Sequence, residues 1–213
     1  MEVRPLITAE AETLSPHLHE CVAEALGAAQ RRLTGLVASK HPALLAMVLR
    51  AEVRERLEQR MLPAGWTVGG DSRLMEQLAL VHAEHMFELR FLKERRRTYP
   101  GGVPTAGRNS ARRRAWHQAT LDLELADVDP APPAATTFLL VWDLRNPQEL
   151  DDGFTPRVVH PVEPGVYGHA VTCDLSLDLL PNGAIFDRLV FEGDADETDF
   201  FPVEIAETAA DDR

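Results

Sequence analysis

Cysteine, lysine and long hydrophobic runs are scarce in this chain of 213 residues. Its two cysteines, Cys21 and Cys173, lie far apart, so the sequence holds no disulfide framework and both thiols are expected to be free. No apolar stretch approaches the roughly 20 residues needed to span a bilayer, and the first residues, Met-Glu-Val-Arg-Pro, lack the apolar core of a signal peptide. These absences predict a soluble, cytoplasmic protein that makes no use of a membrane.

Length and composition indicate an ordinary globular domain. The chain is 45% hydrophobic and 26% charged, and a core of this size needs no structural metal or disulfide. We predict one α+β domain over residues 1–191, with a helical part at 15–62 and a sheet part at 66–191. Residues 192–213 hold nine acidic residues and one basic residue, and are expected to form an acidic, partly ordered tail.

Charge is divided unevenly along the chain, although the net charge is −12. Residues 1–114 contain 18 basic and 13 acidic residues, whereas residues 115–213 contain 4 basic and 21 acidic residues. Arginine outnumbers lysine twenty to two, which with the abundant alanine is typical of a GC-rich genome and makes arginine clusters weaker evidence of function.

The basic excess is greatest in a short central segment. Guanidinium groups pair with phosphates in a bidentate manner, and aromatic rings such as Phe91, Tyr99 and Trp116 can stack on unpaired bases. The segment is therefore a candidate site for anions or nucleic acid, unless it packs against the acidic half of the chain or is simply solvated. The candidate residues are Arg90, Lys93, Arg95, Arg96, Arg97, Arg108, Arg112, Arg113 and Arg114.

Apolar residues at spacings of three and four predict two helices. The first is expected from Ser15 to Val37, with Ser15 as N-cap and Pro16 in the first turn. The second is expected from Pro42 to Leu62, where Pro63 and Gly65 follow. Together they would form a helical hairpin.

The region after the hairpin alternates between apolar and polar residues. Residues 71–97 fit either a strand hairpin or one helix, and the repeated period of two favours the hairpin. Asn109 or Ser110 is expected to cap a short helix that ends at Gln118, and residues 137–142 form the clearest strand. Further strands are expected at 156–160 and 166–180, and Asn182-Gly183 predicts a final hairpin that reaches residue 191. The predicted fold is α+β: an N-terminal helical hairpin followed by a mainly antiparallel sheet with one short helix.

The residues that carry chemistry in enzymes form no recognisable motif here. His82 and His85 have the HxxH spacing, but no third ligand lies near them in the sequence, so no metal ligands are predicted. Glu88-Leu-Arg90 and Asp143-Leu-Arg145 have the acid-x-base form of some metal nucleases, but arginine is a poor substitute for the lysine. Phosphate-binding glycine loops and nucleophile elbows are also absent from the sequence, so we predict no catalytic residues and no cofactor.

Three stretches of the chain together carry a resemblance to other proteins. They are Leu89–Lys93 with Pro100–Pro104, Leu140–Asp143, and Leu179–Asp187 with Phe191–Asp194. Over about the last 150 residues the chain resembles a group of bacterial proteins from GC-rich genomes, to which no activity, ligand or catalytic residue is attached. The resemblance implies a recurring native domain and transfers no function.

Three functional hypotheses remain open. The favoured one is a non-enzymatic binding or regulatory protein that acts through a protein partner or nucleic acid, because the charge is split and no catalytic constellation is visible. The second is a metal-dependent hydrolase or nuclease whose groups meet only in the folded state. The third is an acidic mimic of nucleic acid, which would require the acidic residues to gather on one face.

Overall fold

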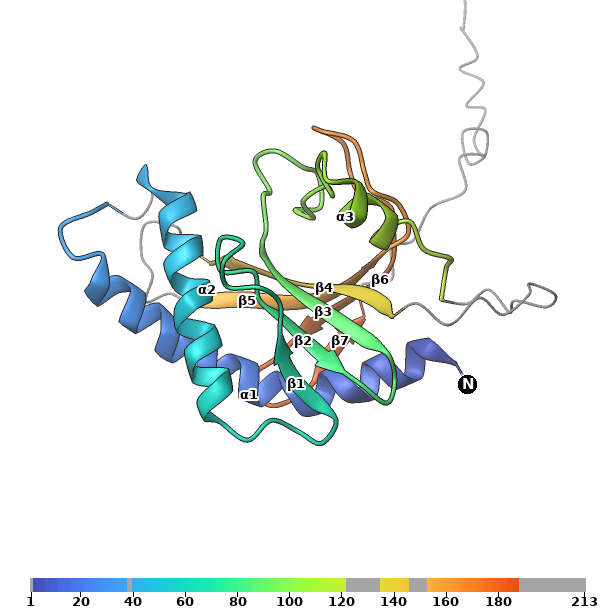
Figure 1. Cartoon of the computed structure of the whole chain (residues 1–213), viewed down its shortest axis with the longest axis horizontal. Helices are drawn as coiled ribbons and strands as arrows, with labels where there is room; N and C mark the ends of the chain where they lie inside the picture. Colours follow the sequence, from blue (N-terminus) through green and yellow to red (C-terminus); the bar gives the residue numbers. More distant parts are fainter. Residues whose placement is uncertain (1, 38–39, 122–134, 146–152, 188–213) are drawn as a thin grey trace, which may run out of the picture.

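The computed structural model describes residues 2–37, 40–121, 135–145 and 153–187, and these residues form an α+β fold (Figure 1). The helices are α1 (Val3–Arg32), α2 (Pro42–Gln59) and α3 (Ser110–Ala115). The strands are β1 (Trp66–Gly69), β2 (Ala79–His82), β3 (Phe87–Lys93), β4 (Thr136–Leu144), β5 (Phe154–Pro161), β6 (Cys173–Leu179) and β7 (Ile185–Asp187). The predicted fold class is confirmed.

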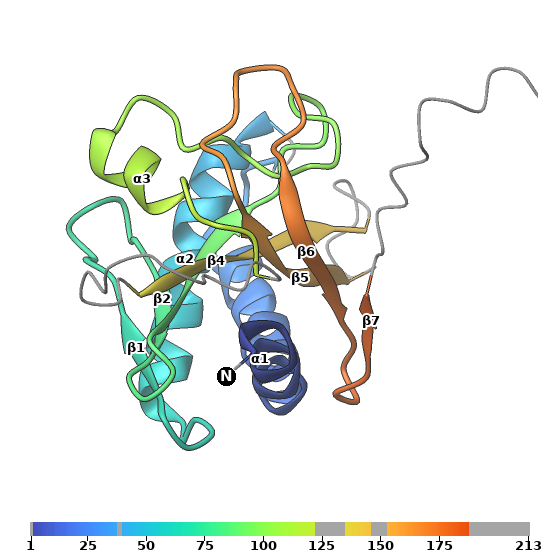
Figure 2. The same cartoon turned by 90° about the vertical axis from the view of Figure 1, so that its right-hand side faces the viewer.

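One seven-stranded sheet contains these strands in the order in which they occur in the chain. All neighbouring pairs are antiparallel except β3 and β4, which are parallel. A parallel pair requires a long crossover connection. Here the connection carries α3, and it places residues 94–121 over the face of the sheet opposite α1 (Figures 1 and 2).

Each face of the sheet has its own core. The larger core lies between the sheet and the α1–α2 pair, and it includes Leu14, Leu49, Leu89 and Phe138. Alternation along the strands turns every second side chain to the other face, where a smaller core forms beneath segment 94–121. The buried residues of this smaller core are Val103, Ala106, Trp116, Leu139, Val141, Val159 and Val171.

The first helix begins at Val3, twelve residues before the predicted N-cap, so the prediction for Ser15 was wrong. Ser15 is a buried interior residue whose hydroxyl donates to the carbonyl of Leu180 at 2.5 Å. Pro16 lies inside the helix and cannot donate to Glu12, four residues earlier. A Cβ added at Gly183 would lie 3.2 Å from the Glu12 oxygen, so the β6–β7 turn packs directly against this carbonyl.

The other boundaries follow the predictions more closely. α1 stops at Arg32 and α2 at Gln59, both earlier than expected, and the hairpin of β2 and β3 confirms the strand interpretation of residues 71–97. β1 was missed because its four residues lead into a glycine turn. Residues 166–172 form a loop rather than the start of a strand.

The predicted 174–191 hairpin is present as β6 and β7, whose turn holds Gly183 at φ +83°. The part of that prediction after residue 187, and the acidic tail, lie outside the described residues. Both cysteines are free thiols. Among the described helices, none combines the length and the hydropathy that crossing a membrane would require.

Candidate nucleic-acid interface

A buried ion pair anchors the basic segment to the sheet. The Glu94 carboxylate is fully buried directly after β3 and accepts from Arg157 Nε of β5 at 2.5 Å. Arg157 also donates to the carbonyl of Gly101, which fixes the following turn. Gly102 has a φ of +81°, and a Cβ there would lie 2.7 Å from Glu94 Oε2, so this turn requires glycine.

A second anchor holds the far end of the segment. The Gln118 amide bonds to both the backbone N–H and the carbonyl of Thr137, at 2.8 Å each. Asp174 accepts from Leu121 N and lies 2.6 Å from Nδ1 of the buried His160. Burial acts to raise the pKa of Asp174, but these bonds outweigh it and hold the pKa below its usual value. Residues 94–121 are therefore attached to the sheet at both ends.

Three of the nine predicted cations form ion pairs. Arg90 pairs with Glu88 on the same strand at 3.0 Å. Lys93 contacts Asp143 at 2.8 Å and lies over the Trp142 ring, 4.7 Å from its centroid. Arg96 contacts Glu94 at 2.6 Å and Asp143 at 3.6 Å. These three side chains hold together β3, β4 and the turn after β3 rather than offering free charge to a ligand.

The other six predicted cations are exposed, and none has a carboxylate partner among the described residues. We name this set the arginine surface: Arg95, Arg97, Arg108, Arg112, Arg113 and Arg114. Two belong to the turn after β3, and four belong to α3 or the loop before it. Both groups lie on the side of the sheet opposite α1, and they flank the 162–172 loop (Figure 2).

Positive charges of the arginine surface lie closest to other cations where α3 approaches β3. Arg112 is exposed as a whole, but its guanidinium is partly desolvated by neighbouring atoms, which lowers its pKa, and the neighbouring charge of Arg90 lowers it further. Burial likewise lowers the pKa of Arg50 on α2, where Glu76 opposes the shift and Arg112 adds to it. Sequence reasoning did not include Arg50, because it lies 40 residues before Arg90. A bound anion would reduce the repulsion among these neighbouring positive charges.

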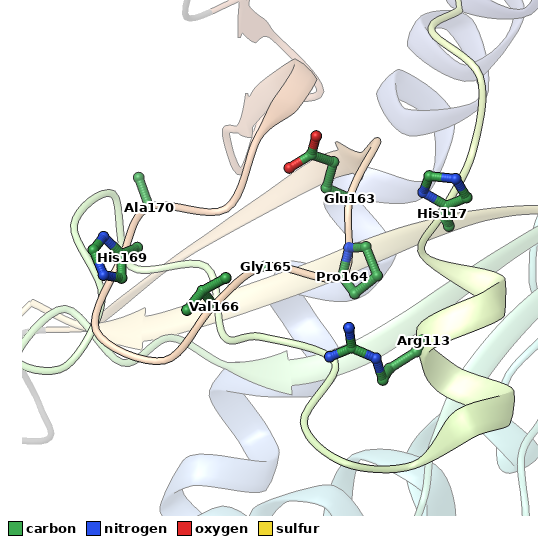
Figure 3. A pocket seen from close by; sticks show the side chains of 8 residues that line it. All are labelled: Arg113, His117, Glu163, Pro164, Gly165, Val166, His169 and Ala170. Atoms are coloured by element: carbon green, nitrogen blue, oxygen red, sulfur yellow. The ribbon is translucent and has the colours of Figure 1, made fainter.

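A cavity of about 690 Å³ lies between α3 and the 162–172 loop. Figure 3 shows Arg113 and His117 on one wall and the segment from Glu163 to Ala170 on the other. The lining residues are Arg113, His117, Glu163, Pro164, Gly165, Val166, His169 and Ala170. Arg113 and His117 face the loop that carries Glu163 and His169, so the donors outnumber the single carboxylate and suit a ligand with anionic groups. Only Arg113 was predicted, because the two histidines are 52 positions apart.

The expected stacking platform is absent from this surface. Phe91, Tyr99 and Trp116 are all buried, so these rings are not accessible for stacking on unpaired bases. Phe91 belongs to the larger core and Trp116 to the smaller one. Tyr167, in the 162–172 loop, is 78% exposed and meets the edge of Tyr99, with ring centroids 5.9 Å apart.

Outside this surface, three other groups deserve a chemical test. Glu88 and Asp143, considered as nuclease acids, are paired with Arg90 and Lys93 respectively, so neither offers an open carboxylate. Within the described residues, one group has the ligand set of a metal site: Glu10, His82 and His85. The HxxH pair was found in the sequence, but Glu10 was missed because it lies 72 residues before His82.

The described residues contain 20 Lys and Arg and 18 Asp and Glu. Segments 122–134, 146–152 and 188–213 hold the other 16 acidic residues, with only two arginines. The acidic character of the chain therefore lies mainly outside the described residues, whose own balance is slightly positive.

Comparison with known proteins gives no information about function, because no protein-family model, curated protein or solved structure matches the chain. Inference about function has to rest on the geometry of the chain itself.

Proposed function

We propose that this protein is a non-enzymatic nucleic-acid-binding protein whose contact surface is the arginine surface. The observation that carries the proposal is the contrast among the nine predicted cations. Three have carboxylate partners, and the six that do not are exposed on one side of the sheet. Unpaired, exposed guanidinium groups at this density are suited to a row of phosphates.

Contact with the phosphate backbone fits this surface better than base stacking. The aromatic residues of the segment are buried, and the nearby Tyr167 is a single exposed ring. Binding by phosphate contacts is sequence-independent and strongly dependent on salt. Accordingly, we expect the protein to bind duplexes of different sequence with similar affinity.

The anchoring of segment 94–121 supports a binding role. The Glu94–Arg157 pair and the Asp174 contacts hold the backbone beneath the arginines, so binding immobilises side chains but needs no rearrangement of this segment. Surfaces fixed before binding lose less conformational entropy when they bind. The hydrolase hypothesis gains no support on this face, because Glu94 and Asp143 are already paired with arginine or lysine.

Fluorescence anisotropy with a labelled 20-base-pair duplex tests the proposal. The variant Arg97→Gln/Arg112→Gln removes one guanidinium from each flank of the 162–172 loop. Because each phosphate contact contributes roughly tenfold near 0.1 M salt and the variant removes two such contacts, we expect it to bind about a hundredfold more weakly.

The matched control is Arg31→Gln/Lys40→Gln, which removes the same charge at the ends of α1 and α2. Binding by the control should stay within about twofold of the unmodified protein. The proposal fails if both variants weaken binding equally, since net charge alone would then explain it, or if the unmodified protein does not bind. If an acidic protein bound to the same surface and a duplex did not, the ligand would be a protein and not nucleic acid.

A further inference from the structure

The cluster of Glu10, His82 and His85 lies on the face of the sheet opposite the arginine surface. Glu10 comes from α1, His82 ends β2, and His85 belongs to the turn between β2 and β3. One possible ligand atom from each residue lies within 4.8 Å of the other two. Segments more than 70 residues apart in the chain therefore bring two imidazoles and a carboxylate together.

We propose that this cluster binds a divalent first-row transition ion such as Zn²⁺. The distances from the Glu10 carboxylate oxygens are 3.5 Å to His85 Nε2 and 3.8 Å to His82 Nε2. Two ligand atoms on one tetrahedral zinc, with bonds near 2.0–2.1 Å, lie about 3.4 Å apart. A shift of a few tenths of an ångström would bring the carboxylate into range of an ion shared with either ring.

Two features of the surroundings favour an ion at this place. Trp66 Nε1 donates to Glu10 Oε2 at 2.7 Å, and such hydrogen bonds to a ligating carboxylate orient it in metal sites. No described residue bonds to the buried His85 Nδ1, so that nitrogen does not fix the ring in its present orientation and the ring can turn toward an ion. The side chains of Glu10 and His85 are 21% and 16% exposed, so water can reach the remaining coordination positions.

The rings must adjust when the ion binds. His82 and His85 stack with centroids 4.3 Å apart and planes 12° apart, whereas two rings that share one ion converge on it. His82 Nδ1 accepts from the His85 backbone N–H at 3.2 Å, and this contact breaks when Nε2 holds a metal and Nδ1 carries the proton. Gly65 permits little movement on one side, since a Cβ there would lie 2.3 Å from His82 Nε2. The adjustment therefore falls mainly on His85 in its turn.

The chemical class of the ion follows from the donors. Two imidazoles and one carboxylate suit Zn²⁺, Co²⁺, Ni²⁺ or Fe²⁺, whereas Mg²⁺ and Ca²⁺ prefer oxygen ligands throughout. An ion here would link α1 to the β2–β3 turn and so stabilise the folded state. The proposal does not depend on the arginine surface, which lies across the sheet, and either can fail without the other.

Titration of the tag-free, EDTA-treated full-length protein with Zn²⁺ and with Co²⁺ tests the site. We expect one Zn²⁺ per chain by calorimetry and an increase in melting temperature. With Co²⁺ we expect visible absorption bands of a low-coordinate ion. Glu10→Gln and His85→Asn should each weaken binding at least tenfold. Glu10→Gln retains an oxygen that accepts from Trp66, and His85 lies in a turn, so both variants should fold.

The control variant is His117→Asn/His169→Asn, which removes two histidines from the cavity beside α3. Its Zn²⁺ affinity should stay within about twofold of that of the unmodified protein. The site is refuted if no Zn²⁺ binds, or if Glu10→Gln and His85→Asn bind as tightly as the unmodified protein. Melting temperatures measured in EDTA show whether a variant lost the ion or lost its fold.

Discussion

Arg54, Arg56 and Arg60, at the end of α2 and just after it, are as close together in the sequence as the arginines of segment 94–121, but they have different neighbours. Arg54 pairs with Glu58, Arg56 with Glu52 and Glu24, and Arg60 with Glu20 and Glu24. The six residues of the arginine surface have no carboxylate partner among the described residues. The comparison shows that the neighbours of an arginine, and not the local count, decide whether its charge holds the fold together or is available to a ligand.

The same difference separates the two faces of the sheet. On the α1–α2 face, ion pairs between α1 and α2 lie at the rim of a large apolar core. On the other face, one buried pair, Arg157 and Glu94, fixes a segment whose remaining cations project outward. Three single substitutions and one multiple variant test this comparison, and they follow in order of decreasing expected effect.

Glu94→Gln should have the largest effect, because it leaves Arg157 buried without a carboxylate. Loss of one partner from a buried pair costs about 3–5 kcal/mol. Urea unfolding measures the change, and duplex binding should weaken as well, since the segment that carries Arg95 and Arg97 loses its anchor. Glu88→Gln is the control, because its partly exposed pair with Arg90 is worth about 1 kcal/mol or less. Equal losses in the two variants would contradict the anchoring role of Glu94.

Asp174→Asn should lower the unfolding free energy by about 1–3 kcal/mol at pH 7, because His160 and Leu121 lose a charged acceptor. The folded pKa of Asp174 lies below its usual value. Its stabilisation is therefore complete above the unfolded pKa, near 4, and disappears as the pH falls through the folded pKa. Urea unfolding at several pH values should show the difference between the proteins shrinking below about pH 4. A difference that persists undiminished at lower pH would refute this account of Asp174.

Glu52→Gln should destabilise the α1–α2 pair by about 1–2 kcal/mol and leave duplex binding unchanged. Burial acts to raise the pKa of Glu52, but hydrogen bonds from Arg56 and Arg32 lower it, so the carboxylate is charged and shared. Thermal unfolding and anisotropy on one sample separate the two effects. If the newly unpaired Arg32 and Arg56 increased duplex affinity as much as the arginine surface does, the contrast between the surfaces would be lost.

Neutralising the C-terminal segment should have the smallest effect. Replacing the nine Asp and Glu residues between Glu192 and Asp212 by Asn and Gln removes long-range repulsion of a polyanion. We expect duplex binding to tighten a few-fold at low salt and to change little near 0.5 M salt, where screening is strong. Weaker duplex binding by this variant would show that the acidic residues do not lower the affinity for the duplex.

Much of the fold could be predicted from local patterns. Periodicity located both long helices and the β2–β3 hairpin, and Asn182-Gly183 marked the last turn correctly. The start of α1 was missed because Ser15 and Pro16 have the local signature of a helix start. In the folded protein, tertiary packing outweighs that signature, since the hydroxyl of Ser15 bonds to Leu180 from a distant strand.

The candidate sites were harder to predict for the same reason. The nine cations were visible in the sequence, but the subset that Glu94 and Asp143 neutralise could not be known before the strands were paired. The aromatic residues were misjudged because burial depends on which face of the sheet is covered. Glu10 joins His82 and His85 only through contact between α1 and β2, which no spacing in the sequence indicates.

The salt dependence of duplex binding tests the central claim most directly. If the arginine surface contacts five or six phosphates, the plot of log K against log salt concentration should have a slope of about −4.5 to −5.4. The variant Arg97→Gln/Arg112→Gln should reduce the magnitude of that slope by about two, and Arg31→Gln/Lys40→Gln should leave it unchanged. Equal slopes for the unmodified protein and the Arg97→Gln/Arg112→Gln variant would contradict the claim that these unpaired arginines bind phosphate.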